Sequence, residues 1–238
     1  MNSELGTLFL VPCHLSEDNK SNILPAYTVE IAQELIHWVA ENEKTARRFL
    51  RDMGTKIGLN DLQFSLLTKD TKPEHVKSLL QPLFEGHSVG LMSEAGCPAV
   101  ADPGNILVAA AHQWGIRVVP LVGPSSILMA LMASGMSGQQ FAFHGYLPID
   151  REQRKKALLA LEMDSKKRKQ TQIFMETPFR NDALLEDALK WLQPSTRLSA
   201  SVDLTGSTEW NFSGTVAQWR KSEIPSLHKR LAVFCLQA

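Results

Sequence analysis

Two carboxylates and a run of small residues lie together in residues 89–104, a combination that suits binding of a small ligand next to acid–base chemistry. Residues 89–92 form a short apolar run, and Glu94, Gly96 and Asp102 follow it within one loop. The apolar run predicts a buried strand. The small residues after it leave the backbone open to close approach by a ligand, and the two carboxylates are candidates for a general base.

The helix after this loop must hold Asp102 in place. Asp102 and Pro103 start it, because Asp is a favoured N-cap and Pro is favoured at the first helical position. Apolar residues continue it to Gly115, a typical C-cap residue. In open α/β sheets ligands bind where a strand passes through a loop into a helix. The same residues also fit a purely structural interpretation, in which Asp102 only caps the helix and Glu94 is solvated.

A second junction of the same kind follows at once. Residues 117–126 predict a strand, a turn at Gly123 and the start of a helix at Ser125 and Ser126. The N–H groups at a helix N-terminus attract an anion, and the serine hydroxyls add donors. Two such junctions in consecutive strand–helix units indicate one shared crevice.

The composition is that of an ordinary globular protein. The 238 residues carry 25 Lys and Arg against 25 Asp and Glu, so the formal net charge of zero gives no global attraction for nucleic acid. Cys13, Cys97 and Cys235 lack metal-type spacing and indicate no disulfide framework, which predicts a reducing, cytoplasmic setting and no metal. We expect no signal peptide and no membrane span, because no apolar run approaches about 20 residues.

Apolar periodicity divides the rest of the chain into further strands and helices. Strands are expected at 7–11, 38–40, 62–67, 141–146, 171–175, 198–202, 210–215 and 231–236, and helices at 29–36, 43–53, 73–84, 151–169 and 182–192. Early alternation of strands and helices, followed by an antiparallel hairpin over 198–215, predicts an α/β protein with a mixed second sheet.

Basic residues gather on two of these helices. Lys44, Arg47 and Arg48 lie on the helix at 43–53, and Arg154 belongs to a second basic group in the helix at 151–169. These groups are either solvated helix faces with ordinary ion pairing or contacts for a phosphate backbone.

The two junctions also resemble a known family. Residues 93–104 and 115–126 resemble the central motifs of the tetrapyrrole-methylase fold family of S-adenosylmethionine (SAM) methyltransferases, in particular the branch that methylates a ribose 2′-hydroxyl of small-subunit ribosomal RNA. Residues 174–180, Leu204 with Thr205, and 213–215 are similar to later elements of that family. The resemblance therefore spans most of the chain.

The resemblance implies a two-domain α/β fold and a site. A mostly parallel sheet is expected in residues 1–122 and a mixed sheet in residues 123–238, with SAM in the cleft between the domains. It also implies a homodimer that acts on ribosomal RNA or the small ribosomal subunit, with Lys44, Arg47 and Arg48 facing the substrate. The positions that border the cofactor in the family are Pro12, Ala95, Gly96, Cys97, Val100, Gly123, Ser125, Ser126, Glu176 and Leu204.

The catalytic group and the methyl acceptor stay open at this point. A ribose hydroxyl needs a base or strong orientation, and the candidates are Glu94, Asp102 and His144. No metal is required, because the methyl group of SAM is already activated for direct displacement. Relatives carry a glycine in the loop at 12–25 that this chain lacks, which leaves three alternatives: a tetrapyrrole or other small-molecule acceptor, a protein acceptor, or a SAM-binding module without catalysis. A dehydrogenase is disfavoured, because no Gly-x-Gly-x-x-Gly follows the first strand.

Overall fold

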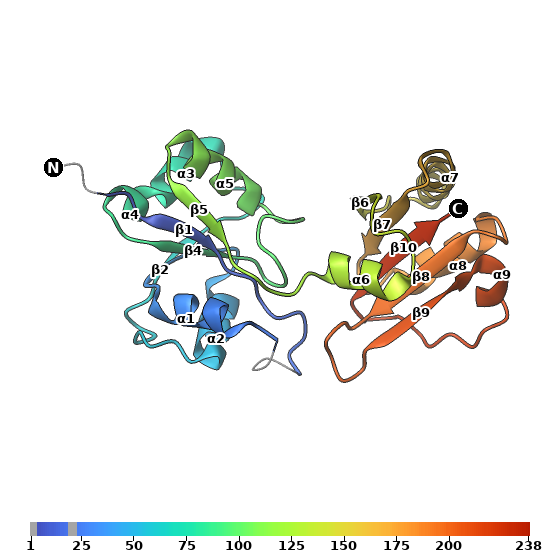
Figure 1. The fold of residues 1–238 in the computed structure, drawn as a ribbon, viewed down its shortest axis with the longest axis horizontal. Coiled ribbons are helices and arrows are strands. Elements are labelled where there is room, and N and C mark those ends of the chain that lie inside the picture. The colour runs from blue at the N-terminus through green and yellow to red at the C-terminus, as the bar shows by residue number, and fades with distance from the viewer. Residues whose placement is uncertain (1–3, 19–22) are drawn as a thin grey trace. The chain divides into compact units, whose positions relative to one another are not determined.

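The computed structural model describes residues 4–18 and 23–238, and the chain divides into two compact units, Met1–Ser125 and Ser126–Ala238 (Figure 1). The boundary that we expect at 122–123 lies close to this division and stays a prediction. No helix in the described part of the chain is long and apolar enough to cross a membrane.

The first unit is built on a parallel sheet. Its strands lie in the order β3-β2-β4-β1-β5, and each adjacent pair is parallel. All five strands therefore point their carboxyl ends to one edge, which we call the carboxyl edge. The expected parallel N-terminal sheet is confirmed. The strands are β1 (Thr7–Leu10), β2 (His37–Ala40), β3 (Gln63–Leu66), β4 (Val89–Met92) and β5 (Arg117–Pro120).

Helices cover both faces of this sheet, with α1 and α2 on one side and α3 and α5 on the other (Figure 1). The central strand β4 is a continuous apolar run because both of its faces are buried. On its neighbours β1 and β2, Leu8 and Trp38 are 0% and 1% exposed, whereas the edge strands β3 and β5 are only partly buried. The helices are α1 (Ala26–Glu34), α2 (Glu43–Met53), α3 (Pro73–Leu79), α4 (Gln81–Phe84) and α5 (Gly104–Gln113).

The single helix that we expect over 73–84 is wrong, because the chain forms α3 and then α4 there. Pro82 has no N–H to donate, so it cannot continue the hydrogen-bond ladder of α3. A proline is tolerated only in the first turn of a helix, so the helix stops and a new one begins around Pro82.

The second unit carries a mixed sheet in the order β6-β7-β10-β8-β9. β6 and β7 are parallel, whereas β7–β10, β10–β8 and β8–β9 are antiparallel, which confirms the expected mixed sheet and hairpin. Phe174, Phe234 and Trp219 are the largest side chains of its core. The elements are α6 (Ser126–Ser134), β6 (Phe141–Tyr146), α7 (Arg151–Arg168), β7 (Thr171–Glu176), α8 (Asn181–Trp191), β8 (Arg197–Val202), β9 (Trp210–Thr215), α9 (Val216–Trp219) and β10 (Ala232–Gln237).

Candidate active site

Three loops meet at the carboxyl edge of the first unit. The loop after β1 pairs with the loop after β4, because the Cys13 N–H donates to the Gly96 carbonyl at 2.8 Å and the Gly96 N–H donates back at 3.2 Å. The loop after β5 joins them, because the Cys97 thiol lies 3.4 Å from the Pro124 carbonyl oxygen. The loops that follow the three neighbouring strands β4, β1 and β5 thus form one connected surface.

Two glycines make this close packing possible. Gly96 has a φ of 72°, a left-handed conformation that side chains disfavour. Gly123 has no room for a side chain, because a Cβ there would lie 2.3 Å from the Pro12 Cβ. A substitution at either position would therefore disturb the surface formed by the three loops.

Asp102 closes the loop after β4. Its Oδ1 accepts the N–H groups of Ala99 (2.9 Å) and Gly104 (2.7 Å), so one carboxylate oxygen holds both the loop and the first residue of α5. The helix begins at Gly104, one residue later than Pro103, where we expect its first residue. Ala99 and Ala101 adopt left-handed backbone, with φ of 66° and 63°, a strained conformation for non-glycine residues.

The other carboxylate oxygen of Asp102 is not used by the loop. Oδ2 is buried and has no hydrogen-bond partner among the described residues. Burial raises the pKa of this carboxyl above its ordinary value of 3.8, although backbone N–H groups lower it. An unsatisfied buried acceptor is costly to a fold, so a ligand or substrate group that donates to it would be favoured.

A third carboxylate, which we did not count among the candidate bases, lies near Asp102 and Glu94. Glu41 follows β2 and is half-buried; burial and the charges of Asp102 and Glu94 raise its pKa, against a backbone hydrogen bond from Glu94. Its position follows from the sheet order, because β2 pairs directly with β4 and the residues after the two strands are neighbours. Glu94 itself is exposed.

The other predicted cofactor positions of this unit lie in the same loops. Pro12 and Gly96 are buried and hold the loops together, while Cys97, Gly123 and Ser125 are half-buried. Ala95 and Val100 are exposed, Val100 by 47%, so their backbone and side chains face outward from the loop after β4. These positions give a partly accessible surface of small residues, and their contacts with the cofactor stay a prediction.

The remaining predicted positions belong to the second unit. Ser126 is the first residue of α6. Leu204 is 7% exposed. Glu176 ends β7 and is buried; its Oε1 accepts the Thr177 N–H at 2.7 Å and pairs with Arg180 at 2.5 Å, while its Oε2 has no partner within the described residues. His144 is exposed on β6 and its Nε2 lies 2.6 Å from Gln172 Oε1.

Some of the predicted basic residues are exposed, whereas others are held by contacts within their own unit. Lys44 and Arg48 are exposed on α2, and Arg48 pairs with Glu17 at 2.7 Å. Arg47 instead serves its own unit: it pairs with Glu43 at 2.8 Å, donates to the carbonyls of Leu59 and Leu62, and lies 4.7 Å from the centre of the Phe64 ring.

Arg154 is also held by contacts within its own unit. It is 5% exposed and forms a buried ion pair with Asp187, so the expectation of a surface cation there is wrong. No group of three or more metal-binding side chains is found in residues 4–18 and 23–238.

Comparison with solved structures defines the fold. The chain resembles the crystal structure of the methyltransferase CobJ, with a TM-score of 0.63 and 15% identity over 98% of this chain and 94% of that one. It also resembles uroporphyrin-III-C-methyltransferase from Thermus thermophilus, with a TM-score of 0.52 and 17% identity over 98% of this chain and 92% of that one. No model of a known protein family matches the chain. The architecture is that of the tetrapyrrole-methylase fold of methyltransferases.

Curated relatives narrow this class. Ribosomal RNA small subunit methyltransferase I of Halalkalibacterium halodurans is 32% identical over 90% of this chain and 69% of the relative. The proteins of the same name from Escherichia coli O157:H7 and Xylella fastidiosa are 32% and 34% identical, over 92% and 89% of this chain and 73% of each relative. The chain belongs to the ribosomal RNA small subunit methyltransferase I family, and it is a SAM-dependent methyltransferase.

Proposed function

We propose that the chain transfers a methyl group from SAM to a ribose 2′-hydroxyl of small-subunit ribosomal RNA. The observation that carries this proposal is its identity of 32–34%, over about nine-tenths of its length, to enzymes named for the small-subunit RNA. The two structural neighbours share the fold at 15% and 17% identity and do not indicate an acceptor.

The carboxyl edge of the first unit would hold the cofactor. The open backbone at Ala95 and Val100, the turn at Gly123 and the serine at position 125 offer small side chains and polar backbone groups to a ligand. SAM, when bound, supplies a methyl group that its sulfonium charge has already activated. The protein contributes by placing the acceptor oxygen in line with this methyl group, and positioning two reactants is worth up to about 7–11 kcal/mol in ideal cases.

Asp102 is the residue that we assign to proton removal. Its Oδ1 is occupied by backbone N–H groups, which leaves Oδ2 to accept the hydroxyl proton as the oxygen–methyl bond forms and the sulfur–methyl bond breaks. The raised pKa makes this carboxylate a stronger base than an ordinary aspartate. Glu41 lies close enough to Asp102 for the Asp102 charge to raise the pKa of Glu41.

The proposal includes a homodimer in the cytoplasm. Met132 and Leu128 on α6 are 80% and 50% exposed, and Trp114 after α5 is 48% exposed. Exposed apolar side chains on two helices are typical of an interface. Sedimentation at micromolar concentration should therefore give a species of twice 26.5 kDa, and a single 26.5 kDa species would contradict the dimer.

Nucleoside analysis tests the reaction. Purified protein is incubated with SAM and small ribosomal subunits that lack its modification, and the RNA is then digested to nucleosides and weighed by mass spectrometry. The expected result is one additional 2′-O-methylated nucleoside per subunit. Base methylation instead, or transfer to protein only, would overturn the proposal.

A further inference from the structure

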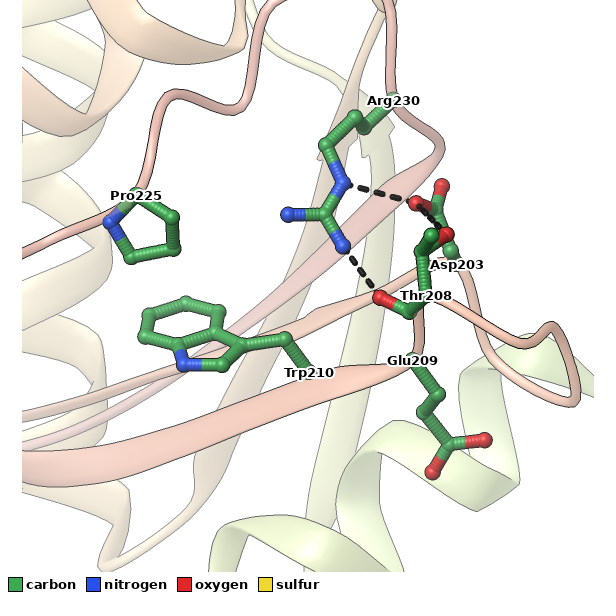
Figure 2. Close-up of a pocket in the computed structure, with 6 residues that line it drawn as sticks. All are labelled: Asp203, Thr208, Glu209, Trp210, Pro225 and Arg230. Atoms are coloured by element: carbon green, nitrogen blue, oxygen red, sulfur yellow. Dashed lines mark hydrogen bonds and ion pairs between the residues drawn. The ribbon is translucent and has the colours of Figure 1, made fainter.

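A pocket of about 550 Å³ opens in the second unit, where β8 ends and β9 begins (Figure 2). We call it the Trp210 pocket. None of its residues is among those that we assign to the cofactor or to proton removal. It is lined by Asp203, Thr208, Glu209, Trp210, Pro225 and Arg230.

The frame of this pocket is held by Asp203. Its Oδ2 accepts from Arg230 Nε at 2.7 Å and from the Thr208 hydroxyl at 2.8 Å, and its Oδ1 accepts the Leu231 N–H at 3.1 Å. Asp203 and Thr205 both have left-handed backbone, with φ of 49° and 69°. Such strained residues persist where surrounding contacts fix them, and they gather at ligand sites. The pocket is therefore a built feature rather than a loose loop.

Two groups in the pocket are suited to a flat, polar ligand. Arg230 Nη2 donates to the Thr208 carbonyl, but Nη1 has no partner among the described residues, and Figure 2 shows the guanidinium beside Pro225 and the Trp210 ring. Trp210 is half-buried; its ring makes an edge contact with Trp219, 6.1 Å between centroids, and stacks with Phe212 at 6.0 Å. A firm aromatic surface next to a hydrogen-bond donor matches a nucleobase.

The charges in the pocket favour a base over a phosphate. Asp203 offsets the charge of Arg230, and Glu209 adds a carboxylate that is fixed by the Thr205 N–H at 2.6 Å and by Asn211 at 2.9 Å. A phosphate would meet this net negative charge, whereas the neutral edge of a base can accept a hydrogen bond from Arg230.

The surroundings of the pocket have the same character. Phe179, which is 68% exposed, lies with its ring 5.7 Å from that of His228, two residues before Arg230. Exposed aromatic rings interspersed with basic residues are typical of surfaces that bind single-stranded nucleic acid. Strand register also places Glu176, a predicted cofactor position, beside Ala232 and at the same sheet edge as Val202, directly before Asp203.

We infer that the Trp210 pocket binds one unstacked base of the RNA substrate. The inference rests on the proposed function and extends it, because it assigns a base-recognition site in the second unit to an enzyme whose chemistry takes place on the ribose. The base stacks on Trp210 and receives a hydrogen bond from Arg230 Nη1.

Binding of a short single-stranded RNA, followed by fluorescence anisotropy, tests this inference. Trp210→Ala should weaken RNA binding about tenfold or more, because stacking of one base on an aromatic side chain typically contributes at least about a factor of ten to affinity. Its salt dependence should stay unchanged, because no phosphate contact is lost. Phe141→Ala, an aromatic side chain of the same unit that is 39% exposed at the start of β6, is the matched control and should bind RNA as wild type does. A duplex of the same sequence should not distinguish the variants.

The outcomes of these experiments distinguish a failure of the pocket inference from a failure of the proposed function. RNA affinity of Trp210→Ala within twofold of wild type would overturn the pocket, and so would a loss of SAM affinity in calorimetry, because the pocket would then belong to the cofactor. Wild-type protein that neither binds nor methylates RNA would overturn the proposed function itself. If Trp210→Ala fails to fold, Trp210→Phe replaces it. RNA should quench the tryptophan fluorescence of the wild-type protein, and this quenching should be lost in Trp210→Phe. Quenching that persists in Trp210→Phe would contradict the inference.

Discussion

Each unit fixes one aspartate side chain, and the two units do so in opposite ways. Asp187 of the second unit is 2% exposed, and cations reach both of its oxygens: Arg151 lies 3.0 Å from Oδ1 and Arg154 lies 2.5 Å from Oδ2. Asp102 of the first unit is held by backbone N–H groups on one oxygen, and its other oxygen has no partner in the described part of the chain. Both oxygens of Asp187 are therefore used by the fold, whereas Asp102 keeps one oxygen for the proton removal that we propose.

The largest effect is expected from Asp102→Asn. The amide keeps an oxygen for the Ala99 and Gly104 N–H groups but cannot take up a proton. Methyl transfer should fall by about 10²–10⁴-fold, the usual contribution of a general base, while the melting temperature changes little. Unchanged transfer in a folded variant would contradict the assigned role.

The pH dependence of wild-type transfer sharpens the same assignment. Burial raises the pKa of Asp102 above its ordinary value of 3.8. As the pH decreases through this raised pKa, the carboxylate takes up a proton and can no longer act as a base, so methyl transfer should fall. The same raised pKa affects stability. A carboxyl whose pKa is higher in the folded state lowers the free energy of unfolding when it is ionised, so this destabilisation is lost as the pH decreases. An acid limb that persists in the residual activity of Asp102→Asn would point to another group, of which Glu41 is the first to test.

Asp187→Asn should show the reverse behaviour. Removing one partner of a buried ion pair leaves Arg154 buried without a counter-charge, which typically costs about 3–5 kcal/mol of folding free energy. Urea denaturation measures this loss. Asp164→Asn is the matched control, because its pair with Arg168 is exposed at 3.9 Å and contributes about 0–1 kcal/mol. Equal midpoints for the two variants would show that the buried pair is not structural.

Much of this fold could be predicted from the sequence, and its limits have physical reasons. Apolar runs located β4 and β5, and the Asp102–Pro103 pair located α5 to within one residue. The roles of basic side chains were harder to predict, because sequence does not distinguish a phosphate contact from an internal ion pair. Arg154 is buried against Asp187, and Arg47 contacts residues of its own unit. The proximity of Glu41 to Asp102 depends on strand order, which periodicity alone does not give.

The smallest effect concerns the exposed cations of α2. Lys44→Gln with Arg48→Gln should weaken RNA binding and reduce its salt slope by about 1.4, since each contact to a single strand contributes about 0.7. Arg47 is left intact because its contacts support the fold. Lys166→Gln with Lys167→Gln, two exposed lysines of α7, is the control for loss of charge alone. An identical slope in wild type and in the α2 variant would remove this helix from the RNA surface.

Calorimetry with SAM tests the central claim most directly, because the account places the cofactor on the three loops at the carboxyl edge of the first unit. Wild-type protein should bind one SAM per chain. Gly123→Val should lose most of this affinity, because a Cβ there lies 2.3 Å from Pro12 and forces the loops apart. Gly138→Ala, whose Cβ would meet nothing closer than 4.0 Å, should bind as wild type does. Wild-type protein without saturable binding, or a folded Gly123→Val with unchanged affinity, would contradict the account.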